Sequence, residues 1–319
     1  MRELRFLSAL MFLLIGAAGF VACDDDDDDD VQPTQDIIQI LSDDSDYSLL
    51  VEAVTKAGLV NVLNTDGPFT LFAPDNDALQ TFLDAAGTNT IENTPANVLE
   101  EVLLTHVLGG LVTSGQLNTG YATTLNPANV NDAVFTNLFF EVDGSVTING
   151  NAQVTNPDIS ASNGVIHEID AVIAPPTVVT FATADDNFSS LVTALTASGL
   201  TTDFVDVLSG DGPFTVFAPT NPAFQALLDS NPDWNSVADI PVATLETVLK
   251  YHVSTAGNVR SEDLTDDMVV STLANESFTV NLSGGGVTIQ AGSNTANVIF
   301  TDVQAENGVI HVIDAVLLP

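Results

Sequence analysis

Basic residues are nearly absent from this sequence of 319 residues. It contains 5 Lys and Arg against 43 Asp and Glu, which gives a formal net charge of −38 at pH 7. Proteins bind nucleic acids through clusters of Lys and Arg, so this composition excludes a nucleic-acid partner. Charged residues make up only 15% of the chain, below the roughly 25% of ordinary soluble domains. The hydrophobic fraction of 45% still provides a core, so the acidity does not indicate global disorder.

Cysteine is equally scarce, because Cys23 is the only one in the chain. A single cysteine excludes an intrachain disulfide framework and any metal site built from several cysteines. Long apolar runs are also missing. The longest, residues 6–20, is shorter than the roughly 20 residues that a transmembrane helix needs.

The N-terminus has the pattern of an export signal. Arg2 and Arg5 precede the apolar run, and small residues lead to Cys23. We therefore predict a signal peptide over residues 1–22. The segment resembles the lipobox of bacterial lipoproteins, which implies that Cys23 becomes the lipidated first residue and attaches the chain to a membrane. An ordinary signal peptide followed by an incidental cysteine is the alternative.

Seven consecutive aspartates follow, at residues 24–30. Like charges in a row repel one another and stay solvated, so residues 23–35 are predicted to form an extended acidic tether. A calcium site is the weaker alternative, since nothing arranges these carboxylates as a ligand loop. Acidic residues directly after a lipidated cysteine resemble the surface-export signal of some bacterial lipoproteins. That resemblance implies an outer-membrane lipoprotein exposed at the cell surface.

The remainder of the chain contains two copies of one repeated unit. Residues 66–79 and 211–224 are identical at 10 of 14 positions, and residues 163–175 and 307–319 at 10 of 13. The offsets of 145 and 144 residues are too long for a solenoid and indicate tandem domains. We place domain 1 at residues 36–175 and domain 2 at residues 176–319, with the boundary near Pro175 and Pro176. Each unit is long enough to fold alone.

Both units share one order of predicted elements: helices first, then strands that alternate in period two. This order indicates an α+β fold with a mainly antiparallel sheet. Asp75 and Thr220 each follow a proline and are predicted to cap a helix. The segment 165–172 is predicted to be a central strand. The other expected helices are 48–57 and 189–198 and one after each of Pro95 and Pro241, and the other expected strands are 69–72, 214–217, 135–142, 146–148, 278–282 and 287–289.

The repeated blocks resemble the signature of fasciclin-like domains. One is Phe-Thr-hydrophobic-Phe-Ala-Pro at residues 69–74 and 214–219, and the other is Asn-Gly-Val-Ile-His at residues 163–167 and 307–311. The family's Tyr-His pair is present as Tyr251 and His252, whereas domain 1 has Thr105 and His106. The resemblance covers roughly residues 36–319. It implies a β-wedge with packed helices and an extracellular adhesion role without catalysis.

All four histidines occupy repeated positions, at His106, His167, His252 and His311. Two per unit could suggest a metal pair, but a zinc site needs three or four ligands and neither unit offers a third His or a Cys. We expect these rings, and Tyr251, to be structural, and we expect no metal and no cofactor. A Gly-x-Ser-x-Gly nucleophile motif is missing as well.

The resemblance also points to one contact segment. Asp158-Ile159 precedes the closing block of domain 1, and Asp302-Val303 is its counterpart in domain 2. In animal matrix members of the family an Asp-Ile pair at this place contributes to integrin contact, which makes these four residues partner-contact candidates. The alternative is an Asp that ends a strand turn, followed by a core residue.

The sequence thus favours a surface-anchored adhesion protein without catalysis. Its partners would be extracellular matrix, polysaccharide or a cell-surface protein. Two alternatives remain open: a surface hydrolase that processes polysaccharides or esters, in which Asp75 or His252 would act, and a passive envelope spacer.

Overall fold

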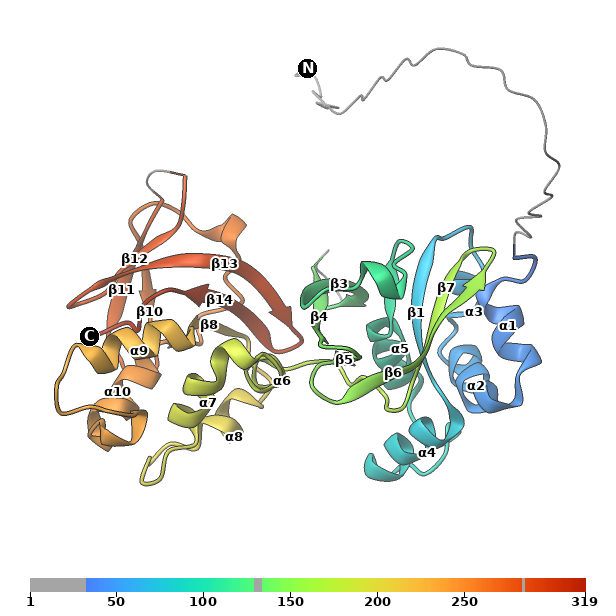
Figure 1. The fold of residues 1–319 in the computed structure, drawn as a ribbon, viewed down its shortest axis with the longest axis horizontal. Coiled ribbons are helices and arrows are strands. Elements are labelled where there is room, and N and C mark those ends of the chain that lie inside the picture. The colour runs from blue at the N-terminus through green and yellow to red at the C-terminus, as the bar shows by residue number, and fades with distance from the viewer. Residues whose placement is uncertain (1–32, 129–133, 283–284) are drawn as a thin grey trace, which may run out of the picture. The chain divides into compact units, whose positions relative to one another are not determined.

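The computed structural model describes residues 33–128, 134–282 and 285–319. Within this part of the chain, domains 1 and 2 each combine five α-helices with seven strands, and the first strand of each domain lies between its third and fourth helices in the sequence (Figure 1). The predicted α+β class is therefore confirmed. The signal peptide, Cys23 and residues 24–30 lie outside the described residues.

Domain 1 places five α-helices around its sheet. The helices are α1 (Ile37–Asp43), α2 (Ser48–Lys56), α3 (Val60–Leu63), α4 (Asn76–Ala85) and α5 (Ala96–Thr105), with 3₁₀ turns η1 (Ser45–Tyr47) and η2 (Ser114–Gln116). The strands are β1 (Phe69–Pro74), β2 (Val107–Gly109), β3 (Gly120–Pro127), β4 (Phe135–Val142), β5 (Val146–Ile148), β6 (Ala152–Ala161) and β7 (Gly164–Ile169). They close into a barrel in the order β1 to β7.

Domain 2 repeats the order with small changes in length. The helices are α6 (Val178–Ala184), α7 (Ser189–Leu195), α8 (Phe204–Leu208), α9 (Asn221–Asp229) and α10 (Val242–Tyr251), with 3₁₀ turns η3 (Asp186–Phe188), η4 (Val237–Asp239) and η5 (Ser261–Asp263). The strands are β8 (Phe214–Pro219), β9 (Val253–Ser254), β10 (Met268–Ser271), β11 (Ser277–Asn281), β12 (Thr288–Gln290), β13 (Thr295–Ala305) and β14 (Gly308–Ile313). The sheet runs β10-β11-β12-β13-β14-β8-β9, and the amide of Leu273 reaches the carbonyl of Val253 at 2.8 Å across its two edges.

The repeated sequence blocks form the centre of each sheet. The first block is β1 or β8, and the closing block is β7 or β14, which pairs with it in parallel. Most other pairings are antiparallel, such as β6 with β7 and β13 with β14. The prediction of a central closing strand is confirmed, since β7 lies between β6 and β1, although it ends at Ile169.

These central strands are buried on both faces. In β1, Leu71 packs into the cluster under the helices, and its neighbour Phe72 points into a second cluster within the barrel. In β8, Val216 and Phe217 divide between two clusters in the same way. Successive strand residues face opposite sides, so an unbroken apolar segment is what a strand covered on both faces requires.

Most predicted helix and strand positions agree with the structure, with one correction at a helix start. Asp75 caps α4, because its Oδ1 accepts the amide of Ala78 at 2.8 Å. Thr220 occupies the equivalent N-cap position of α9 but makes no side-chain capping bond, so that prediction was wrong. Pro222 in the first turn has no amide hydrogen, which leaves fewer donors there for a cap to satisfy. The helix predicted over 189–198 also ends early, at Leu195.

Candidate partner-contact site

The Asp-Ile segment of domain 1 lies on a bulged strand. Strand β6 shifts register against β7 between Val154 and Asn156 and again before Ile159. Asp158 has a φ of 64°, in the left-handed region, which Asp adopts more readily than most residues other than Gly. A bulge re-aims the side chains of its strand and interrupts its pairing. Asp158 is thereby directed away from the β6–β7 ladder.

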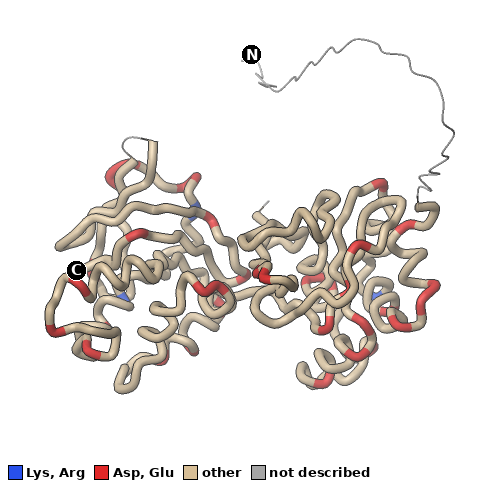
Figure 2. Tube along the Cα trace, in the orientation of Figure 1, with Lys and Arg blue, Asp and Glu red and all other residues tan. Residues whose placement is uncertain are grey.

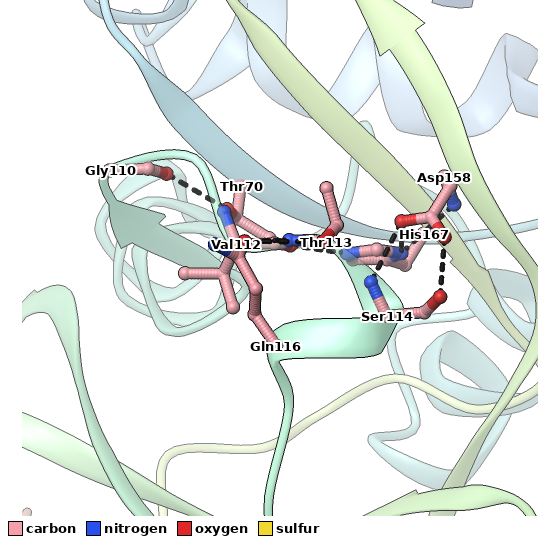
Figure 3. Close-up of polar contacts among 8 residues, drawn as sticks. All are labelled: Thr70, Gly110, Val112, Thr113, Ser114, Gln116, Asp158 and His167. Atoms are coloured by element: carbon pink, nitrogen blue, oxygen red, sulfur yellow. Dashed lines mark hydrogen bonds and ion pairs between the residues drawn. The ribbon is translucent and has the colours of Figure 1, made fainter.

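The Asp158 carboxylate holds the neighbouring 3₁₀ turn η2 (Figure 3). Its Oδ1 accepts the amide of Ser114 at 2.8 Å, and its Oδ2 accepts the Ser114 hydroxyl. Desolvation by itself would raise the pKa of Asp158, but the two bonds from Ser114 outweigh it and hold the pKa below the usual value. The side chain remains 40% exposed.

His167 supports the bulge from beneath. Its Nδ1 accepts the amide of Asp158 at 3.2 Å, and its Nε2 donates to the carbonyl of Val112 at 2.9 Å. A carbonyl oxygen can only accept, so these partners assign a neutral ring with its proton on Nε2. Val112 in turn donates to the Thr70 hydroxyl at 2.9 Å, and that hydroxyl donates to the carbonyl of Gly110 at 2.8 Å (Figure 3). The chain of bonds ties the bulge and η2 to the central strand β1.

Domain 2 repeats this network at η5. Asp302 has a φ of 62°, and its carboxylate accepts the amide of Ser261 at 2.8 Å as well as the Ser261 hydroxyl. His311 Nε2 donates to the carbonyl of Val259 at 2.9 Å, and Val259 donates to the Thr215 hydroxyl. One bond differs: His311 Nδ1 is buried and has no hydrogen-bond partner among the described residues.

Ser114, His167 and Asp158 include the residue types of a hydrolytic triad, but their bonds run in a different order. A triad needs the serine hydroxyl to donate to the histidine, and the carboxylate to orient the ring from its other side. Here the serine donates to the aspartate, and the ring binds backbone groups through both nitrogens. The geometry connects loops and does not activate a nucleophile.

The second histidine of each domain is fully enclosed at the end of a helix. His106 Nδ1 donates to the carbonyl of Val102 at 2.7 Å, and its Nε2 accepts the amide of Ile173 at 2.9 Å. His252 bonds Val248 and Leu317 at the same two distances. Burial lowers the pKa of both rings to about 4 against the opposing effect of the helix carbonyl, so they are neutral at pH 7.

The neighbours of these two histidines differ. The Tyr251 hydroxyl donates to the carbonyl of Ser277 at 2.9 Å and so joins α10 to β11. The Thr105 hydroxyl donates to the carbonyl of Glu101 at 2.9 Å and accepts the side-chain amide of Asn126 at 3.0 Å. Different side chains therefore link the helix to the sheet in the two domains: Thr105 in domain 1 and Tyr251 in domain 2.

Exposure differs among the four contact candidates. Asp158 is exposed and Ile159 partly buried, where it packs on the core cluster under the helices. Asp302 is partly buried, and Val303 is buried with 1% of its surface exposed. Close to them on β13, Ile299 is 56% exposed. The two bulges thus expose different side chains, although similar hydrogen bonds hold their backbones.

Sequence reasoning overlooked a pair of asparagines that explains the closing block. Asn163 Nδ2 donates to the carbonyls of Leu63 at 2.7 Å and Thr65 at 3.1 Å, and its Oδ1 accepts the amide of Ile37 at 3.0 Å. Asn307 makes the corresponding bonds to Leu208, Gly210 and Val178. The only sequence signal for this role was that an Asn-Gly pair is repeated at the start of both closing blocks.

The glycine after each asparagine has a steric reason. A Cβ on Gly164 would overlap the Phe69 carbonyl oxygen, and one on Gly308 would overlap that of Phe214. The parallel pairing of the first and last strands therefore needs glycine at this position.

In the described residues, no group of three or more His, Cys, Asp and Glu side chains is arranged to hold a metal ion. None of the helices described is both long and apolar enough to cross a membrane. Acidic residues are scattered along both domains and do not gather in one segment (Figure 2).

Comparison with known proteins places the chain in a family. The fasciclin domain matches residues 45–175 and residues 186–319, so the chain belongs to the fasciclin domain family and carries two copies. It is similar to the uncharacterized protein sll1735 of Synechocystis, with 41% identity over 143 residues, which cover 45% of this chain and 98% of that protein. It is also similar to transforming growth factor-beta-induced protein ig-h3 of Sus scrofa, with 32% identity over 255 residues. That match spans 79% of this chain but only 35% of the relative.

A solved structure has the same fold. It is a FAS1 domain pair from the insect cell adhesion molecule fasciclin I, with a TM-score of 0.50 and 22% identity over 84% of this chain and 95% of that one. The predicted family and the tandem fasciclin fold are therefore confirmed.

Proposed function

We propose that this chain is a membrane-anchored adhesion protein that binds extracellular matrix, polysaccharide or a cell-surface protein and performs no catalysis. The observation that carries the proposal is a duplicated fasciclin domain that follows a segment with the sequence pattern of an export signal, which ends at the lone Cys23. Cys23 would carry the lipid, residues 23–35 would form the tether, and the chain would be exposed at the cell surface. Two linked domains gain avidity when both reach one ligand.

The bulges of β6 and β13 are the proposed contact surfaces. They contain the candidates Asp158, Ile159, Asp302 and Val303, and their frame is fixed by the Asp–Ser and histidine bonds described above. Because Val303 is buried, contact through domain 2 would come from Asp302 and from Ile299. A preformed surface reduces the entropy lost on binding.

Two features support a role without catalysis. His106 and His252 are enclosed with both ring nitrogens occupied by backbone groups, and Asp75 is used as a helix cap. A general base must reach the proton that it removes, which enclosed rings cannot do.

The anchor is tested with a Cys23→Ala variant in the native host. Metabolic acyl labelling should mark the wild-type chain and not the variant, and protease added to intact cells should remove the wild-type domains. An unlabelled wild-type chain, or one that protease reaches only after lysis, would refute the anchored and exposed location.

The contact surfaces are tested with the purified mature chain on arrays of matrix proteins, polysaccharides and intact cells. Arginine at two exposed bulge positions, in the double variant Asn156→Arg and Ile299→Arg, should weaken binding about tenfold or more by placing a charged side chain in the interface. Thr247→Arg, on the exposed side of α10, is the matched control. Binding no stronger than that of an equally acidic control protein would contradict adhesion and favour a spacer.

A further inference from the structure

Domain 2 contains an apolar cavity of about 80 Å³ beneath its helices. Its walls come from α6, α7, α8, α10 and the central strand β8, and the side chains that shape it include Val178, Ala182, Leu195, Phe204 and Val216. The lining residues with polar side-chain atoms are Thr183, Thr196 and His252. Both nitrogens of His252 are already bonded, so the interior offers a ligand almost only carbon surface.

The cavity lies where the two domains differ in side-chain size. Helix α1 of domain 1 places Leu41 where α6 has Ala182, and Ile37 where α6 has Val178. On the central strand, Leu71 of domain 1 corresponds to Val216. Two lining residues are larger in domain 2: Phe204 on α8 corresponds to Leu59, and Leu195 on α7 corresponds to Val54. The two residues of α6 that line the cavity, Val178 and Ala182, are both smaller than their counterparts in domain 1, so space is left beside this face of α6.

The cavity reaches the surface between the helices. Among its lining residues, Thr183 and Thr196 are exposed, and Val205 on α8 is 40% exposed. A molecule could therefore enter past α6, α7 and α8 without passing through the sheet.

Size and charge define the ligand. A cavity of about 150 Å³ holds benzene, so about 80 Å³ has room for roughly three or four carbon atoms in a thin arrangement. No Lys or Arg lines the cavity, and domain 2 has 17 acidic residues against two basic ones. A carboxylate or phosphate at the mouth would therefore be repelled.

We propose that domain 2 binds the end of a straight, uncharged hydrocarbon chain in this cavity, with the polar end of the molecule outside near Thr183 and Thr196. The inference goes beyond adhesion and does not depend on it. The proposed site would give domain 2 a ligand that the Leu41 side chain of domain 1 blocks.

A homologous series of alcohols tests the proposal. Binding of 1-propanol through 1-octanol to the mature chain would be followed by methyl chemical shifts and by calorimetry. Affinity should rise about fourfold per added methylene, the equivalent of about 0.8 kcal/mol, until the cavity is full, and then level off. Octanoate should bind at least about tenfold more weakly than 1-octanol, because its charge would have to approach an acidic surface without a cation.

Ala182→Leu places the domain 1 side chain in the cavity and should abolish this binding. Thr193→Leu, at an exposed position of α7 outside the lining, is the matched control and should bind as the wild type does. Leu41→Ala in domain 1 should create a second, weaker site. If Ala182→Leu does not fold, Ala182→Val serves, with a loss of affinity of about tenfold.

Two outcomes would overturn the proposal. One is the lack of saturable binding across the alcohol series. The other is a folded Ala182→Leu variant whose affinity equals that of the wild type, which would place the binding elsewhere.

Discussion

Domains 1 and 2 share their polar framework more closely than their apolar filling. The bonds of Asn163 and Asn307, of His106 and His252, and of the Asp–Ser pairs recur with nearly the same lengths. The core residues instead exchange size, as between Leu41 and Ala182. Buried polar groups need particular partners, whereas an apolar position requires only about the right volume. The two domains therefore share these buried polar bonds and differ mainly in the size of the apolar side chains packed around them.

The largest expected loss of stability comes from replacing the buried asparagines of the shared polar framework. Asn163→Ala or Asn307→Ala would leave two carbonyls and one amide unpaired, at about 1–3 kcal/mol each. We expect the free energy of unfolding of the altered domain to fall by about 4 kcal/mol. If the two frameworks are equivalent, the loss should be the same in both domains. Urea unfolding measures this, with the single tryptophan, Trp234, reporting domain 2 and circular dichroism reporting both.

The exposed Asn118→Ala and Asn235→Ala variants control for the loss of an asparagine as such. Their stability should stay within about 0.5 kcal/mol of the wild type. An equally small loss at Asn163 or Asn307 would show that the polar framework does not determine stability.

The enclosed histidines should make both domains sensitive to acid. Their folded pKa of about 4 lies below the ordinary value of 6.5, so the unfolded chain takes up protons first as the pH falls. The contribution of the two rings to stability is full above pH 6.5 and is lost as the pH falls through 4. Each ring contributes up to about 3 kcal/mol to this loss.

His252→Asn, which cannot titrate, isolates the effect in domain 2. Trp234 fluorescence during urea unfolding at pH 7.5, 6, 5 and 4.5 should show a smaller loss of stability with acid in this variant than in the wild type. Domain 1, with His106 intact, should retain its slope. An unchanged slope for domain 2 would assign the acid sensitivity to other groups.

A smaller effect distinguishes the partners of the histidines. Tyr251→Phe removes the bond to the Ser277 carbonyl and should cost domain 2 about 1 kcal/mol. Thr105→Val leaves the Asn126 amide without this partner and should cost domain 1 a similar amount. If Tyr251→Phe were neutral while Thr105→Val was costly, the tyrosine would be needed for something other than stability.

Local patterns were enough to predict much of this fold. The segments 135–142 and 146–148 were predicted to be strands and are β4 and β5, although residues 136–140 of β4 are all buried and do not alternate in period two. The repeated blocks identified the two central strands before their pairing was known. Strand β6 was not predicted, because it contains Pro157 and many polar residues and is exposed along much of its length.

The site was less predictable for a physical reason. Asn163 bonds Ile37 and Leu63 across 126 and 100 residues of chain, and nothing near Asn163 in the sequence indicates those partners. The Asp158 bond to Ser114 is also non-local. The cavity beside Ala182 depends on which side chains face each other across α6 and β8, and only the folded structure shows that.

The smallest predicted difference concerns the two bulges. His167 accepts the Asp158 amide, whereas the matching nitrogen of His311 has no partner among the residues described, so the domain 1 bulge is held by one bond more. Asp158→Asn and Asp302→Asn each remove a charge-assisted acceptor, and we expect the serine amides at the two sites to exchange hydrogen about fivefold faster, equivalent to about 1 kcal/mol. In the wild type, Ser114 should exchange more slowly than Ser261, and acid should remove its protection only below the ordinary pKa range of aspartate, because the pKa of Asp158 is lowered. Equal exchange at Ser114 and Ser261 would mean that the histidine bond does not stiffen the bulge. Any difference in partner contact between the two domains would then come from the exposed residues of β6 and β13 and not from the hydrogen bonds that hold the bulges.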